Sequence, residues 1–215
     1  MDIKGIILDM DGTMLDTEPL SFYGWEKAVN DIGLTLSQEF MFGCVGLPSA
    51  EICRNFLDHF GNDFDFVGFR ERSQAHVKGV VEKSGVPLKP GLFELLDFIK
   101  EKNLKCAVAT STGRQRAMYL MDKVDISRYF DVIICGDSIK HGKPNPDIYL
   151  KTAEALGHSA EQCMAVEDSK NGILAAARAN TYAVLIPDLI IPDNEMLSVA
   201  TSKVESLFDV IELLK

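Results

Sequence analysis

Residues 3–13 have the sequence IKGIILDMDGT, in which a short aliphatic run ends in two acids and a glycine. A β-branched and aliphatic run that stops at a polar cluster is typical of a buried parallel strand. Asp9 would then stand at the carboxyl end of that strand, where open α/β sheets bind their ligands. Extended backbone projects Asp9 and Asp11 to the same side, and such close carboxylates stay ionised only beside a cation. An Asp-x-Asp-Gly segment is also found as a plain turn, so this stretch alone does not decide the function.

Similar runs recur along the chain, at residues 104–109, 131–135, 163–166 and 182–186. The segments between them carry apolar residues at helical spacing, for example Leu92, Leu95, Leu96 and Ile99, and again Ala117, Leu120, Met121 and Val124. Alternating strands and amphipathic helices indicate a doubly wound, Rossmann-like α/β core with a mostly parallel sheet. The carboxyl ends of its strands should meet at one edge.

Residues 17–86 break this alternation. They contain no comparable strand run, but they hold apolar residues such as Phe22, Trp25 and Phe56 at helical spacing. We therefore expect an all-helical insert, with residues 1–16 and 87–215 forming the α/β core. Glycine and proline at residues 85–91 mark the return of the chain to that core.

The composition limits the classes of partner. The chain has 215 residues and a net charge of -10, which disfavours nucleic acids and anionic membranes. A small phosphorylated metabolite remains compatible, because salt screens distant charge within about 8 Å. Five scattered cysteines without a C-x-x-C pair, and no signal peptide or long apolar span, predict a cytoplasmic protein with free thiols. We expect a monomer.

Two further segments at strand ends carry groups suited to phosphate. Thr110, Ser111 and Thr112 follow the run at 104–109, and their hydroxyls and backbone N–H groups could hold phosphate oxygens. Taken alone, such residues are more often helix N-caps. Lys143 lies in the sequence Gly-Lys-Pro-Asn-Pro, where it is either a solvated loop charge or a partner for a phosphate or an attacking carboxylate.

A second pair of acids, Glu167 and Asp168, follows the run at 163–166. Acids at the start of a helix are commonly caps. Adjacent carboxylates at a strand end that faces Asp9 would also supply the hard oxygen ligands that Mg²⁺ prefers. The order of the elements brings these acids and Asp9 to one edge of the sheet.

Taken together, four ordered motifs resemble the haloacid dehalogenase superfamily, in the branch of β-phosphoglucomutase and small sugar-phosphate phosphatases. The motifs span nearly the whole chain: DMDGT at 9–13, Thr110 with Ser111, Lys143 in GKPNP, and Glu167-Asp168-Ser169. The resemblance implies that Asp9 is a nucleophile and Mg²⁺ ligand. It implies that Asp11 is the general acid and base, with its backbone carbonyl on the metal. Asp168 would be a further ligand, and Glu167 a ligand or the holder of a metal-bound water.

The resemblance also assigns groups to the substrate. Thr110 and the backbone of Ser111 would bind phosphate, and Lys143 would pair with both the phosphate and the nucleophile. The helical insert would be the cap of this family, which closes over the active site and sets substrate choice. Within it, residues 43–49 around Gly46 are the candidate substrate loop, and Arg114 is a weaker candidate at the mouth of the site.

Two departures from the family pattern bear on the reaction. Phosphoglucomutases of this family carry a histidine shortly after the first motif and an arginine in the substrate loop, whereas residues 16–21 and 45–49 contain neither. We therefore expect a magnesium-dependent phosphatase that hydrolyses small phosphate monoesters through a phospho-aspartyl intermediate. The alternatives are a β-phosphoglucomutase-type sugar phosphomutase and a non-catalytic module that binds phosphate or a partner. A dinucleotide enzyme is disfavoured because no G-x-G-x-x-G follows the first run.

Overall fold

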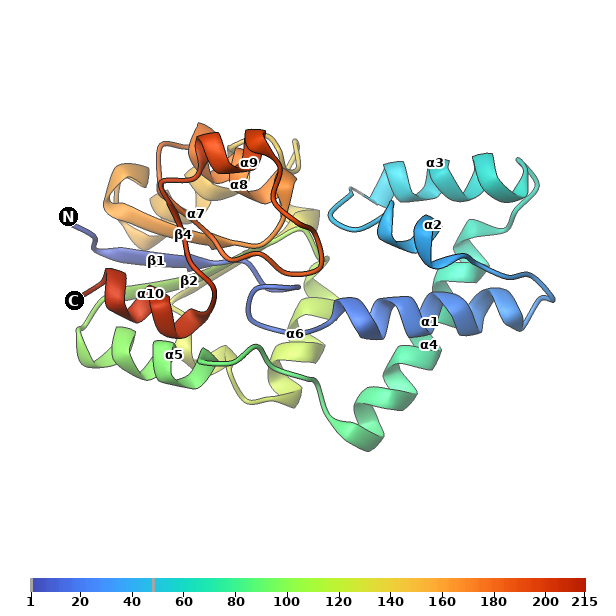
Figure 1. Cartoon of the computed structure of the whole chain (residues 1–215). Coiled ribbons are helices and arrows are strands. Elements are labelled where there is room, and N and C mark those ends of the chain that lie inside the picture. The colour runs from blue at the N-terminus through green and yellow to red at the C-terminus, as the bar shows by residue number, and fades with distance from the viewer. Residues whose placement is uncertain (1, 48) are drawn as a thin grey trace. The chain divides into compact units, whose positions relative to one another are not determined.

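The computed structural model describes residues 2–47 and 49–215, which form two compact units (Figure 1). The core unit joins the residues up to Leu15 to Pro87–Lys215, and the helical insert is Asp16–Val86.

A six-stranded parallel sheet forms the centre of the core unit in the described part of the chain. Its strands are β1 (Gly5–Leu8), β2 (Lys105–Thr110), β3 (Val132–Cys135), β4 (Cys163–Glu167), β5 (Tyr182–Leu185) and β6 (Ser202–Lys203). Their order is β3-β2-β1-β4-β5-β6, so the chain winds outward from β1 in both directions. This topology confirms the predicted doubly wound fold. The short strand β6 was not predicted.

Helices cover both faces of this sheet. They are α5 (Leu92–Glu101), α6 (Arg114–Lys123), α7 (Asp147–Leu156), α8 (Lys170–Arg178), α9 (Asn194–Val199) and α10 (Leu207–Leu213), with short 3₁₀ turns η1 (Ser127–Tyr129), η2 (Gly136–Ser138) and η3 (Ala160–Gln162). Figure 1 shows α7, α8 and α9 on one face and α5 with α10 on the other. No helix in the described ranges is both long enough and apolar enough to cross a membrane.

The sheet is apolar because both of its faces are covered. All four residues of β1 are buried, and Ile7 packs with Ala107 of β2, Ala153 of α7 and Ile173 of α8. Central parallel strands read as continuous apolar runs for this reason. Burial of β1 on both sides fixes the place where its polar continuation, Asp9, leaves the sheet.

The helical insert contains α1 (Glu18–Asn30), α2 (Gln38–Phe42), α3 (Ser49–Phe60) and α4 (Phe66–Ser84). Its small core is aromatic: the fully buried ring of Phe56 contacts Trp25, Phe40 and Phe69 at centroid distances of 5.6, 5.0 and 4.4 Å. Helices α1 and α4 approach closely at Gly24, where a Cβ would overlap the side chains of α4. The insert is thus all-helical, as predicted.

Candidate active site

The carboxyl ends of three neighbouring strands place the predicted residues at one edge of the sheet. In the register of β1, Leu8 pairs with Val108 of β2 on one side and with Val166 of β4 on the other. Asp9 continues β1 by donating its backbone N–H to the carbonyl of Val166 at 3.0 Å. Because all three strands run in parallel, the segments that follow them emerge side by side.

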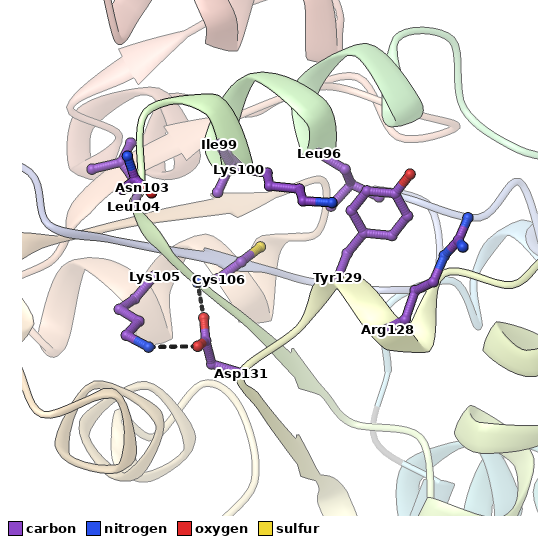
Figure 2. A pocket seen from close by; sticks show the side chains of 10 residues that line it. All are labelled: Leu96, Ile99, Lys100, Asn103, Leu104, Lys105, Cys106, Arg128, Tyr129 and Asp131. Atoms are coloured by element: carbon purple, nitrogen blue, oxygen red, sulfur yellow. Dashed lines mark hydrogen bonds and ion pairs between the residues drawn. The ribbon is translucent and has the colours of Figure 1, made fainter.

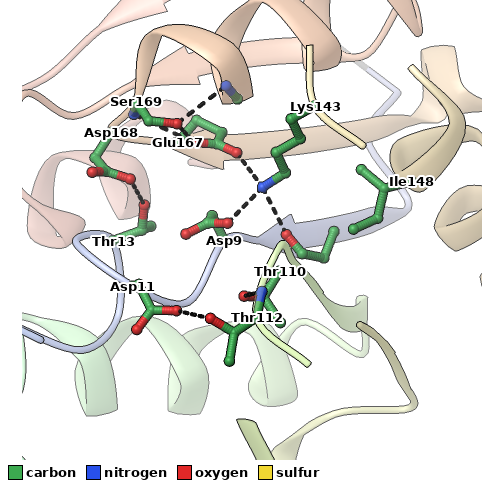
Figure 3. Close-up of polar contacts among 12 residues, drawn as sticks. Asp9, Asp11, Thr13, Thr110, Thr112, Lys143, Ile148, Glu167, Asp168 and Ser169 are labelled. Atoms are coloured by element: carbon green, nitrogen blue, oxygen red, sulfur yellow. Dashed lines mark hydrogen bonds and ion pairs between the residues drawn. The ribbon is translucent and has the colours of Figure 1, made fainter. Parts of the chain in front are cut away.

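Lys143 reaches this edge from the loop before α7 and is buried there, with 6% of its surface exposed. Its ammonium donates to Asp9 Oδ1 at 2.5 Å, to Glu167 Oε1 at 2.5 Å and to the carbonyl of Ala109 at 2.9 Å (Figure 3). A lysine has three N–H donors, so all of them are used. The alternative of a solvated loop charge is therefore wrong for this lysine.

Asp9 lies in an environment that opposes its ionisation. Burial is the main cause, and together with the charge of Glu167 it raises the pKa of Asp9 to about 8, although Lys143 acts in the opposite direction. Burial also lowers the pKa of Lys143, but the neighbouring Asp9 and Glu167 outweigh it and raise that pKa above its usual value. Lys143 therefore stays protonated. Its single positive charge cannot balance both Asp9 and Glu167 when these two acids are ionised.

Asp168 belongs to the last motif and contacts residues of the first motif. Its Oδ1 accepts a hydrogen bond from the Thr13 hydroxyl at 3.0 Å. Gly12 has a left-handed backbone with φ of 83°, and a Cβ at this position would overlap the Asp168 carboxylate. Burial and the charges of Asp9 and Glu167 raise the pKa of Asp168 well above its usual range. Glycine at position 12 thus provides both the turn and the space for this second acid.

Glu167 is enclosed on every side. Its Oε1 accepts hydrogen bonds from Lys143 and, at 2.6 Å, from the buried hydroxyl of Tyr149, while its Oε2 accepts one from the Ser169 hydroxyl at 3.1 Å. A Cβ at Gly172, in the first turn of α8, would overlap the same carboxylate. The N-cap of α8 is Ser169, whose hydroxyl accepts from the N–H of Gly172, so neither acid caps this helix.

Asp11 and Thr110 both contact Thr112, in the segment that follows β2. The carboxylate of Asp11 is half-buried and accepts a hydrogen bond from the Thr112 hydroxyl at 2.7 Å. The hydroxyl of Thr110 accepts the N–H of Thr112 at 3.0 Å. The alternative that these hydroxyls cap the next helix is wrong, because α6 has Gly113 at its N-cap and no side-chain cap hydrogen bond.

The other candidate residues are Ser111, Arg114 and Gly46. Ser111 is exposed, and its backbone packs against Gly136, where a Cβ would overlap the Ser111 carbonyl. The guanidinium of Arg114 donates to the carbonyl of Ile133 on β3 at 3.5 Å rather than to any residue of the acidic cluster. Gly46 lies in the helical insert, between α2 and α3. Pro48 of the predicted substrate loop lies outside the described residues.

Comparison with known proteins identifies the family. A family model described as haloacid dehalogenase-like hydrolase matches residues 6–186, a span that contains all four motifs. The chain belongs to the haloacid dehalogenase-like hydrolases.

Individual relatives agree with this assignment. A phosphorylated carbohydrates phosphatase from Thermotoga maritima is 33% identical over 177 residues, which cover 82% of this chain and 82% of the relative. The fructose-1-phosphate phosphatase YqaB of Escherichia coli is 33% identical over 183 residues, covering 84% of this chain and 94% of the relative. The crystal structure of β-phosphoglucomutase from Clostridium difficile is 25% identical, with a TM-score of 0.80 and coverage of 98% and 96%. This haloacid dehalogenase-like hydrolase is thus an enzyme of the phosphoric monoester hydrolase type.

The acidic cluster of this hydrolase has the composition of a metal site. Asp9, Glu167 and Asp168 are buried and each offers one oxygen, and these oxygens lie within 4.8 Å of one another. When all three carboxylates are ionised, the single ammonium of Lys143 leaves two negative charges unbalanced, which one divalent cation would balance. Hard oxygen donors of this kind suit Mg²⁺ or Ca²⁺. The donor set therefore fits the metal that the motifs imply, although the side chain of Asp11 is not among the three.

Two residues of the site were not predicted from the sequence as contributors: Thr13 and Tyr149. Thr112 was predicted to hold phosphate, and its hydroxyl donates to Asp11 in the structure. Thr13 belongs to a quoted motif, so a hydroxyl beside the acids was an available signal. Tyr149 lies on the buried face of α7, and its spacing indicates only a core residue.

A separate cavity of about 440 Å³ lies at the other end of the sheet, where β2 begins (Figure 2). Its lining includes Cys106, Tyr129 and Asp131, and the Asp131 carboxylate is held by Lys105 and by the N–H of Cys106. Asp131 is the one acid among the described residues that line it. This cavity lacks the buried group of carboxylates found around Asp9, so it is not our candidate for the reaction site.

Proposed function

We propose that this enzyme is a magnesium-dependent phosphatase of phosphorylated carbohydrates that works through a phosphoryl group carried by Asp9. The observation that carries the proposal is the Asp9 carboxylate itself, buried at the end of the central strand. One of its oxygens is tied to Lys143, while Oδ2 accepts no hydrogen bond from the described residues. Two of its relatives are named a phosphorylated carbohydrates phosphatase and a fructose-1-phosphate phosphatase, which supports this substrate class.

The metal would be held by Asp9 and Asp168, with the backbone carbonyl of Asp11 as the family motif implies. When bound, magnesium supplies positive charge that draws in the phosphate and offsets the charge on its oxygens. Glu167 already accepts hydrogen bonds at both oxygens, which supports a role in holding Lys143 more than a role as a direct ligand.

In the first step, Asp9 attacks the phosphorus of the ester and the bond between phosphorus and the sugar oxygen breaks. Asp11 gives its proton to that leaving oxygen, so the sugar departs as a neutral alcohol. Lys143 offsets the negative charge on the phosphoryl oxygens. The Thr110 hydroxyl accepts a hydrogen bond from Thr112, so its own proton is free to point at a phosphate oxygen.

In the second step, water attacks the phosphorus of the acyl phosphate on Asp9. Asp11, now ionised, takes a proton from that water, the bond between phosphorus and the Asp9 oxygen breaks, and inorganic phosphate leaves. Splitting the hydrolysis in this way needs one group that gives and then takes a proton. Asp11 suits that task because it is half-buried and is oriented by Thr112.

The helical insert would act as the cap that selects the sugar. We assign the substrate loop to residues 43–49 around Gly46, and a weaker contact to Arg114, on the family pattern alone. The two helices that flank this loop contact each other, because Phe40 of α2 packs against Phe56 of α3 at a centroid distance of 5.0 Å.

A sugar phosphomutase is the second candidate, because the chain shares its fold with a β-phosphoglucomutase along nearly its whole length. Purified protein with Mg²⁺ should be incubated with β-glucose 1-phosphate, fructose 1-phosphate and a panel of other sugar phosphates. Release of inorganic phosphate supports the phosphatase, and formation of glucose 6-phosphate supports the mutase. No turnover across the panel, with the protein folded and Mg²⁺ present, would reject both.

A further inference from the structure

Tyr149 places a polar group in the middle of the core, directly behind the active site. Its side chain is fully buried on α7, six residues after Lys143. Its hydroxyl donates to Glu167 Oε1 at 2.6 Å, the same oxygen that accepts the Lys143 ammonium. Burial, together with the neighbouring charge of Glu167, raises the pKa of Tyr149 well above its usual value, so the hydroxyl keeps its proton and acts as a donor.

The ring of Tyr149 contacts the same lysine. Lys143 Nζ lies 5.2 Å from the centroid of the ring, within the range of a cation–π interaction. The ammonium is thus bounded by the ring and by its three acceptors on Asp9, Glu167 and Ala109. Tyr149 is the one described side chain that both contacts the ammonium through its ring and bonds to an acceptor of that ammonium.

The other oxygen of Glu167 is fixed independently. Oε2 accepts from Ser169 at the start of α8, and the lack of a side chain at Gly172 lets the carboxylate fit against that helix. Oε1 has two hydrogen-bond donors among the described residues, Lys143 and Tyr149. Tyr149 is therefore the donor that holds Oε1 independently of Lys143. Without the hydroxyl, the Lys143 ammonium would be the one remaining hydrogen-bond partner of Oε1 among the described residues.

We propose that Tyr149 is a positioning residue for Lys143, acting through the Glu167 carboxylate and through its own ring. This inference rests on the proposed function, in which Lys143 offsets charge on the phosphoryl group. A charge that moves away from its working position stabilises the transition state less, even when the substrate still binds. A purely structural tyrosine would instead contribute to folding and leave the reaction unchanged.

The test compares Tyr149→Phe with Tyr182→Phe. Tyr182 makes a similar hydroxyl contact, to Ser202 at 2.7 Å, at the far end of β5 from the acidic cluster. Both variants lose one hydroxyl hydrogen bond and keep the ring, so Tyr182→Phe, at a partly buried tyrosine, controls for the loss of a hydroxyl away from the acidic cluster. We expect kcat on the best sugar phosphate to fall about tenfold or more in Tyr149→Phe, with KM changed less than about threefold, and Tyr182→Phe to match the wild type.

A second readout follows the lysine directly. The Lys143 ammonium is buried with all three donors used, so its ¹⁵Nζ signal in the NMR spectrum should be protected from exchange, and Lys143→Arg identifies it by its loss. We expect Tyr149→Phe to shift this signal or to speed its exchange, and Tyr182→Phe to leave it unmoved. An unmoved signal together with wild-type kcat in Tyr149→Phe would overturn the inference. If the wild type hydrolyses no phosphate ester, the proposed function fails, while the NMR comparison still decides whether Tyr149 positions Lys143.

Discussion

The two ends of the same sheet each carry a lysine–aspartate pair, with nearly equal contact distances. At the carboxyl end, Lys143 lies 2.5 Å from Asp9, and at the amino end Lys105 lies 2.6 Å from Asp131. The side chains of the first pair are 5% and 10% exposed, and those of the second are 53% and 37% exposed. The contacts match, but their surroundings do not.

This difference in burial shifts the pKa values of the two carboxylates in opposite directions. Burial raises the pKa of Asp9 to about 8, against the pull of Lys143. Burial also pushes the pKa of Asp131 upward, but hydrogen bonds from Lys105 and the Cys106 N–H outweigh it and hold that pKa below its usual value. A short ion pair is therefore not a sign of catalysis. The distinguishing feature is a buried group of acids that outnumbers its basic partners. A bound cation would supply the missing positive charge.

The largest expected effect comes from removing the proposed nucleophile. Asp9→Asn should lower phosphate release at least about a thousandfold, because the covalent intermediate cannot form, while the protein stays folded. The matched change at the other pair, Asp131→Asn, should leave kcat within about twofold of the wild type and cost about 1 kcal/mol of stability. Steady-state kinetics and thermal unfolding of both variants test this. Full activity in a folded Asp9→Asn protein would reject the covalent route.

A somewhat smaller loss is expected at Asp11. Asp11→Asn keeps the size of the side chain and an oxygen that can accept from Thr112, but it removes the ionisable carboxyl group, so kcat should fall about 10²-fold to 10⁴-fold. The loss should be smaller for esters with good leaving groups, such as an aryl phosphate, because their oxygen needs less protonation. An equal loss for sugar and aryl phosphates would argue against Asp11 as the acid.

The pH dependence of stability should separate the two pairs. The pKa of Asp9 lies at about 8 in the folded, metal-free protein and at its ordinary value of 3.8 when unfolded, so the folded state binds more protons between these values. The stability of chelator-treated protein should therefore fall as pH rises from about 4 to about 8. Asp131 contributes only at the acid end, since its lowered pKa gives stability that is lost as pH falls below its ordinary value.

Added Mg²⁺ should oppose that loss, because it replaces the missing positive charge and competes with protons for the same oxygens. We expect the rise in melting temperature on adding Mg²⁺ to be larger at about pH 8 than at about pH 6. Thermal unfolding with and without Mg²⁺ at each pH measures this. The Asp9→Asn protein should show a weaker response to Mg²⁺, and an unchanged response would contradict the assignment of Asp9 to the metal.

The smallest effect is expected at the exposed pair. Lys105→Ala should change stability by less than about 1 kcal/mol, and the difference should shrink further at high salt, because exposed ion pairs are screened. Denaturant unfolding at low and high salt checks this. A large, salt-independent loss would mean that the amino-end pair is more than a surface contact.

Much of the fold was predictable because the central strands are buried on both faces and therefore appear as unbroken aliphatic runs. Five of the six described strands were found as such runs, including the edge strand β3, whose residues Val132–Ile134 are only half-buried. Strand β6 could not be found in this way, since Ser202–Lys203 is short, polar and half exposed. The predicted apolar face of α5 is buried in full, from Leu92 to Ile99.

For the active site, the sequence predicted which segments meet but not which side chains contact each other. Parallel strands bring their carboxyl ends to one edge, so Asp9, Thr110 and Glu167 were placed together by topology alone. Their hydrogen-bond partners were not, because these contacts depend on side-chain rotamers and join distant positions. Thr13 and Asp168 lie 155 residues apart in the chain. Tyr149 gave no polar signal, since its helical spacing matches the core residues Ile148 and Ala153 around it.

The most direct test of the central claim is to find the phosphoryl group on the protein. The enzyme should be mixed with its best sugar phosphate and Mg²⁺, quenched in acid and reduced with borohydride, which converts an acyl phosphate to an alcohol. Peptide mass spectrometry then locates the reduced residue. The account predicts reduction at Asp9 and at no other acid. Modification of Asp11 or Asp168 instead, or rapid turnover with Asp9 never modified, would contradict it.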